Sequence, residues 1–194
     1  MKLFYKLTIL ILTFLISISF ADNKSLRGLD GYQTAVIDAS KNARGHSNMG
    51  NLYYDEKNYV GAIKEYEIAL NLTEIPRQKA VYMYNIASCL YNLGDYKNSK
   101  IYSEKAILND YMNISYYKLL AKNIVRLKLE TPEIEKLNQD KSNPFNEILV
   151  GLIYLEKEEK TIALTILDDF VNKYPKMLVT QDVIQIIKQI KQTI

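Results

Sequence analysis

The sequence offers few side chains whose types and spacing could support catalysis. Its single histidine, His46, has no cysteine near it and no carboxylate at a spacing that would complete a metal site. No serine or cysteine occupies a recognisable nucleophile setting, and no glycine-rich loop could cradle a phosphate. The single cysteine, Cys89, lies within an apolar helical pattern, which indicates a small core residue. We therefore expect no enzymatic activity, no metal and no cofactor.

Charged residues form two kinds of pattern. The acidic cluster at 156–159 has the spacing of a solvated helix end. Three cations, Lys118, Lys122 and Arg126, are spaced four residues apart, so on a helix they would share one face. The formal net charge of +3 comes without a polybasic arm, and we expect no nucleic-acid partner. The basic stripe is either an ordinary solvated face or a contact for an acidic partner.

The N-terminal residues have the pattern of a secretory signal. Lys2 and Lys6 precede an uncharged apolar run over 7–20, which is followed by the small residue Ala21. As a helix this run would reach about 21 Å, short of the roughly 30 Å hydrocarbon core of a bilayer. We expect residues 1–21 to be a signal peptide, 22–29 a flexible leader, and the protein to be periplasmic. No lipobox cysteine follows the run, so membrane attachment would occur only through an uncleaved signal.

The stretch MGNLYYDEKNYVGAIKEYEIALNLTEIP, residues 49–76, reads as two amphipathic helices joined by a tight turn. The small residues Gly50, Ala62 and Ala69 stand where the two helices would approach closely. An apolar stripe between the helices comes from Met49, Tyr53, Tyr59, Ile63, Tyr66 and Leu70. This pattern resembles the tetratricopeptide repeat, a helical hairpin of about 34 residues that stacks into a solenoid.

The resemblance implies an all-α solenoid of about four repeats, within a helical domain over 30–194. We expect the repeats at about 44–76, 80–110, 114–142 and 144–175. The third is expected to have a shortened second helix that opens at Thr131 and Pro132. Capping helices are expected at both ends, over 30–43 and over 180–194. In the last of these, Val183, Ile186, Ile187, Ile190 and Ile194 form one apolar stripe.

In the tetratricopeptide family the first helices line a concave groove, which implies a set of partner-binding residues here. The first repeat would contribute Arg44, Ser47, Asn51, Tyr54 and Asp55; the second Val81, Tyr84, Asn85, Ser88, Tyr91 and Asn92; the third Lys118, Lys122 and Arg126. The fourth would contribute the apolar residues Phe145, Ile148, Leu152 and Leu155. Some family members grip a terminal carboxylate with a clamp of cations and asparagines, but Ser47, Ser115 and Leu119 stand where its cations belong.

The sequence therefore predicts a periplasmic scaffold that binds a peptide or protein segment in the groove, and family analogy suggests envelope assembly as its setting. Two alternatives stay open. One is a peptidoglycan-associated or enzyme-accessory factor that presents acidic residues to a glycan. The other is a structural oligomer, in which the apolar residues of the fourth repeat bury against another chain.

Overall fold

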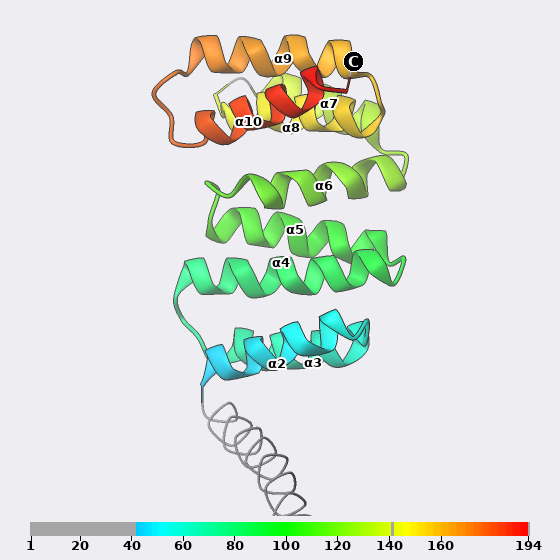
Figure 1. Ribbon diagram of the computed structural model, residues 1–194, viewed down its shortest axis with the longest axis vertical. Coiled ribbons are helices and arrows are strands. Elements are labelled where there is room, and N and C mark those ends of the chain that lie inside the picture. The colour runs from blue at the N-terminus through cyan, green and yellow to red at the C-terminus, as the bar shows by residue number, and fades with distance from the viewer. Residues whose placement is uncertain (1–41, 141, 194) are drawn as a thin grey trace, which may run out of the picture.

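The computed structural model describes residues 42–140 and 142–193, and every regular element within them is an α-helix (Figure 1). The all-α prediction is confirmed. Successive helices run back and forth as hairpins that stack along one axis. The helices are α2 (Ala43–Asp55), α3 (Tyr59–Asn71), α4 (Pro76–Asn92), α5 (Tyr96–Asn109), α6 (Ile114–Arg126), α7 (Glu130–Gln139), α8 (Phe145–Glu156), α9 (Lys160–Lys173) and α10 (Thr180–Lys191).

The turns after α2, α4, α6 and α8 share one geometry. Each contains a residue with positive φ: Lys57 (60°), Gly94 (82°), Lys128 (57°) and Glu158 (64°). After α4, the N–H of Gly94 donates to the Tyr91 carbonyl at 3.0 Å and that of Asp95 to the Leu90 carbonyl at 2.9 Å. These bonds satisfy carbonyls that the helix end leaves without partners. Glycine adopts a positive φ readily, as Gly94 does here, and the other three turns accept the left-handed conformation without glycine.

The close approach of α2 and α3 depends on Gly50. A Cβ added at Gly50 would lie 2.5 Å from Cε1 of Tyr66, a ring that is 2% exposed. The Tyr66 hydroxyl also donates to Oδ1 of Asn51 at 2.7 Å, so the ring is held in place. The α8–α9 hairpin repeats this arrangement, because a Cβ at Gly151 would lie 2.7 Å from Cδ2 of Leu167. The prediction that small residues bring the helices together is confirmed at these positions.

Two helices begin earlier than the sequence predicted. The first helix of the second repeat begins at Pro76, not near Ala80. Proline suits the first helical position, because the N–H that it lacks would have no partner within the helix there, and because its fixed φ is already helical. The second helix of the third repeat, α7, begins at Glu130, so Thr131 is inside the helix and does not cap it. No residue of α7 is buried.

α7 is short and only partly buries Ile134 and Leu137 against the core, and α6 packs directly against α8. The rings of Tyr117 and Phe145 stack with centroids 5.6 Å apart and planes at 17°. Ile148 and Leu152 are 0% and 2% exposed and belong to one core cluster with residues of α6, α9 and α10. The C-terminal half of the solenoid therefore has a single continuous core.

The expectation that the apolar residues of the fourth repeat face a ligand or another chain is wrong. Phe145, Ile148 and Leu152 are buried inside the protein, and Leu155 packs against the same cluster. These side chains pack in one cluster with residues of α6, α9 and α10. An apolar run has the same pattern whether its own chain or a partner covers it.

The C-terminal helix closes the solenoid as predicted. The side chains of Val183, Ile186, Ile187 and Ile190 are buried on one stripe of α10. Ile194 lies outside the described residues, as do the predicted signal peptide, the predicted leader and residues 30–41 of the predicted N-terminal cap. Residue Asn42 caps α2 by accepting a hydrogen bond from the Gly45 N–H at 2.7 Å.

We predict that Gly50→Ala lowers the free energy of unfolding by about 1–3 kcal/mol, because Tyr66 cannot shift without losing packing and its bond to Asn51. Thermal denaturation followed by circular dichroism measures the change. Asn48→Ala, at an exposed position of the same helix, is the matched control and should change stability little. Equal melting temperatures for the two variants would contradict the close-approach argument.

Candidate functional site

Hydrogen bonds join the exposed ends of successive first helices. Between α2 and α4, the side-chain amide of Asn92 donates to the Tyr54 hydroxyl at 2.9 Å. The Tyr54 ring meets Tyr59 edge-on, with centroids 5.4 Å apart. Burial raises the pKa of Tyr54 above its usual value, so its hydroxyl stays protonated at neutral pH. This contact fixes the second repeat against the first.

The next link runs from α4 to α6. Nε of Arg126 donates to the Tyr91 hydroxyl at 3.2 Å, and the Tyr91 ring meets Tyr96 edge-on at 5.1 Å. The hydrogen bond with Tyr91 raises the pKa of Arg126 further above its ordinary value. We call the exposed side of α2, α4 and α6 the ladder face. Its residues are Tyr54, Tyr91, Asn92, Lys118, Lys122 and Arg126.

Buried polar contacts set the register that makes this second link possible. The Ser99 hydroxyl donates to the Ala87 carbonyl at 2.8 Å, and the Asn123 amide donates to the Ser99 oxygen at 2.9 Å. Ala87 lies one turn before Tyr91, and Asn123 lies about one turn before Arg126. The network therefore holds α6 against the α4–α5 hairpin at the height where Arg126 meets Tyr91.

The three cations of α6 share one face, as their spacing predicted, and Glu156 at the end of α8 faces them. Burial raises the pKa of Glu156, although the positive charges of Lys122, Arg126 and Lys118 act in the opposite direction. Among the described residues, no carboxylate lies within 4.0 Å of these three cations. Glu156 is thus a half-buried group, and the expectation of a solvated helix end is wrong for it.

The other predicted residues of the second repeat lie beside this face. Tyr84 and Tyr116 pack with ring centroids 5.2 Å apart. The Ser88 hydroxyl donates to the Tyr84 carbonyl at 3.0 Å, so it is used within its own helix. Asn85 is half-buried on α4. Tyr84 and Asn85 therefore add a partly exposed aromatic group and a partly exposed amide beside the ladder face.

The predicted residues of the first repeat divide between surface and interior. Arg44 is exposed, and Asn51 is exposed while it accepts the Tyr66 hydrogen bond. Ser47 departs from the prediction, since it is 9% exposed and lies on the side of α2 that also carries Gly50. His46 bonds through Nδ1 to Oε2 of Glu65 at 2.7 Å and joins α2 to α3.

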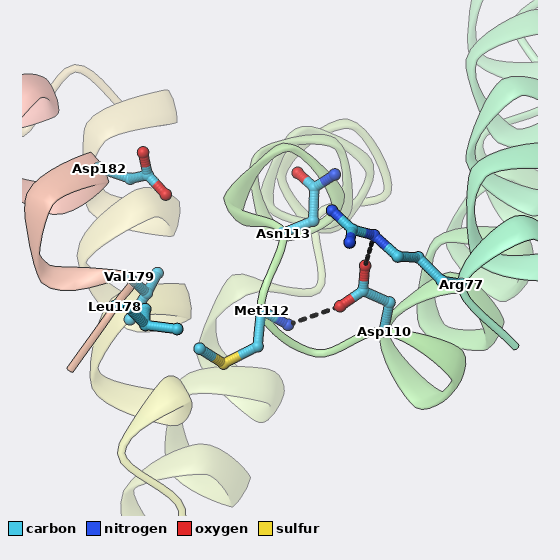
Figure 2. A pocket seen from close by; sticks show the side chains of 7 residues that line it. All are labelled: Arg77, Asp110, Met112, Asn113, Leu178, Val179 and Asp182. Atoms are coloured by element: carbon cyan, nitrogen blue, oxygen red, sulfur yellow. Dashed lines mark hydrogen bonds and ion pairs between the residues drawn. The ribbon is translucent and has the colours of Figure 1, made fainter.

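A cleft of about 470 Å³ opens at the other end of α6 (Figure 2). Arg77 comes from the start of α4 and Asp182 from the first turn of α10. Nε of Arg77 lies 3.9 Å from Oδ2 of Asp110, whose Oδ1 accepts the Met112 N–H at 3.2 Å. The complete lining is Arg77, Asp110, Met112, Asn113, Leu178, Val179 and Asp182.

Sequence reasoning missed Arg77 and Asp182 as surface residues of interest. Arg77 was assigned to a connection, although Pro76 in front of it is a usual first residue of a helix. Reading that signal would have placed Arg77 on the side of α4 that carries Val81 and Tyr84. No local signal could have placed Asp182 near α6, because α10 and α6 are far apart in the chain.

Within the part of the chain that the structure describes, no three His, Cys, Asp or Glu side chains gather so that they could hold a metal ion. None of the described helices is long and apolar enough to cross a membrane. Cys89 is fully buried, and burial raises the pKa of its thiol to about 12. This thiol therefore stays protonated and is a core residue, as predicted.

Comparison with known proteins identifies one of the hairpins. Residues 149–176 match the family model of the tetratricopeptide repeat. The fold is similar to that of pilF from Pseudomonas aeruginosa, with a TM-score of 0.52 and 20% identity over 79% of this chain and 70% of that one. A comparison with curated protein sequences finds no significant match.

Other similar structures include YrrB, described as a tetratricopeptide-repeat protein with an unusual peptide-binding site. Its TM-score is 0.48 at 19% identity, over 85% of this chain and 86% of that one. The tetratricopeptide domain of Arabidopsis OM64 has a TM-score of 0.43 at 15% identity, over 80% and 99% of the two chains. The hairpin architecture defines an all-α solenoid. Residues 149–176 are similar to a tetratricopeptide repeat, and the described helices have the fold of a solenoid of such hairpins.

We predict that Glu156→Gln stabilises the protein at neutral pH. A carboxyl whose pKa is raised by folding binds its proton more tightly in the folded state. Wild-type stability therefore falls as the pH rises from the unfolded value of about 4.3 through the folded pKa. The glutamine variant does not titrate and lacks this loss. Its free energy of unfolding should therefore exceed that of the wild type by an increasing amount from pH 4 to pH 7, as measured by urea denaturation.

Glu135→Gln, at an exposed position of α7, is the control and should show no comparable pH-dependent gain. If Glu156→Gln is less stable than the wild type at pH 7, attraction to the three cations outweighs burial, and the assignment of the raised pKa is wrong.

Proposed function

We propose that this protein is a binding adaptor that holds a segment of a partner protein against the ladder face. One observation carries the proposal: the first helices of three successive hairpins present a connected polar surface whose three cations have no described carboxylate within 4.0 Å. Repeat proteins of this architecture form extended surfaces from side chains of neighbouring repeats. A surface shared by α2, α4 and α6 therefore suits an extended segment.

The side chains of the ladder face support an acidic partner. Arg126 uses Nε to bind Tyr91, and its exposed guanidinium end remains suited to a carboxylate. Lys122 is exposed one turn before it. Tyrosine and asparagine supply rigid amphipathic area and amide groups that can bond a peptide backbone. Glu156 faces the stripe with one negative charge against the three positive charges of Lys118, Lys122 and Arg126.

We predict that reversing the charge at Lys118, Lys122 and Arg126 to glutamate weakens binding of acidic peptides at least about tenfold. Each exposed ion pair contributes up to about 1 kcal/mol, so loss of three pairs accounts for this factor. Fluorescence anisotropy with labelled peptides graded in net charge measures the affinity. The control reverses three exposed lysines away from the face, Lys136, Lys176 and Lys188.

Equal loss of affinity in both triple variants would mean that only net charge matters, and would overturn a role for the ladder face. Unchanged affinity in the variant of the ladder face would overturn it as well. Circular dichroism of each variant separates loss of binding from loss of folding.

We also propose that the adaptor acts in the periplasm, in the assembly of the cell envelope. The support is the sequence of residues 1–21, with two lysines, an apolar run and a small residue at its end. Residues in this segment lie outside the described part of the chain.

The export proposal predicts that the protein recovered from cells begins at Asp22, after removal of residues 1–21. N-terminal sequencing or intact mass spectrometry measures this directly. Recovery of the chain with Met1 still present would rule out cleavage. Replacing Ala21 with a bulky residue should block processing, because the peptidase requires a small residue there.

A further inference from the structure

The ladder face continues along α4 to the cleft at the start of α6. On α4, Arg77, Val81, Tyr84, Ser88 and Asn92 are spaced three or four residues apart and so share one side of the helix. Asn92 ends this row at the bond to Tyr54, and Arg77 begins it in the cleft. The row therefore connects the two features of the surface.

The two ends of α6 carry opposite net charge. Lys122 and Arg126 lie toward its C-terminal end, while Lys118 lies nearer its start, and the charges of all three act on the carboxylate of Glu156. At its N-terminal end, Asp110 and Asp182 line the cleft with the single cation Arg77. Asp182 has no ion pair with another described residue, and Arg77 reaches Asp110 only at 3.9 Å. The surface along α6 thus runs from acidic to basic.

The cleft also has an apolar side, which Figure 2 shows between Asp182 and the Asp110 loop. Leu178 is 81% exposed there, next to Met112 and Val179. An apolar surface beside a carboxylate suits a lysine or arginine side chain, whose aliphatic stem packs while its charged end stays in water. One residue of a partner would therefore use both the apolar side chains and Asp182.

The length of α6 sets the distance between these two contacts. The helix has 13 residues, which corresponds to about 20 Å at 1.5 Å per residue. An extended peptide covers about 3.3 Å per residue, so the same distance takes about six residues.

We propose that the segment bound on the ladder face is bipolar: an acidic residue contacts Lys122 and Arg126, and a lysine or arginine about six residues away enters the cleft beside Asp182 and Leu178. This inference rests on the proposed function and adds the charge pattern of the partner to it. The observations that carry it are the opposite charges at the ends of α6 and the apolar side of the cleft.

The test compares two labelled peptides of equal length on the purified protein. Both carry aspartates at one end; about six residues away, one has a leucine–lysine pair and the other a leucine–glutamate pair. We expect the bipolar peptide to bind about fivefold more tightly, as one exposed charge contact allows. In Asp182→Lys the preference should reverse, and in the milder Asp182→Asn it should disappear.

Asp169→Lys, on the exposed side of α9, makes the same change of charge elsewhere and should leave the preference intact. Equal binding of both peptides to the wild type, with loss of both in the triple variant of the ladder face, would overturn the bipolar inference and keep the proposed function. A preference that Asp182→Lys leaves unchanged would also overturn it, since Asp182 would then only stabilise the first turn of α10 and would not contact the peptide. Binding of neither peptide would overturn both.

Discussion

Direct packing of α6 on α8 is the contact on which the rest of the C-terminal half depends. A full second helix in the third repeat would separate these two first helices, but α7 is short and has no fully buried side chain. Tyr117 therefore stacks on Phe145, and the residues of α10 complete the same core. This arrangement brings Glu156 to the basic stripe and Asp182 to the start of α6. The positions of both side chains therefore depend on the same helix packing.

The N-terminal half depends on regular repetition. Each hairpin closes with the same left-handed turn, and small residues such as Gly50 let its helices approach closely. Regular hairpins place the ends of the first helices side by side, where Tyr54 meets Asn92 and Tyr91 meets Arg126. The side chains that make these two hydrogen bonds are exposed or only partly buried. The residues that link successive repeats therefore also form the candidate surface for a partner.

Sequence reasoning recovered the features that depend on local pattern. The helical hairpins, the apolar stripe of α10 and the shared face of the three cations on α6 all follow from spacing of a few residues. It failed where a side chain's environment depends on a distant element. Ser47 and Phe145 were expected at a surface and are buried, and Glu156 was expected in solvent and is half-buried.

The sequence by itself determined which segments are helices and which face of each is apolar, because helix periodicity is a property of neighbouring residues. Only the tertiary structure decided what covers each face. α8 packs on α6 beside a short α7, and no local pattern of residues shows this contact. The cleft between Arg77 and Asp182 exists for the same reason, since its two sides lie far apart in the chain and meet only when the core closes.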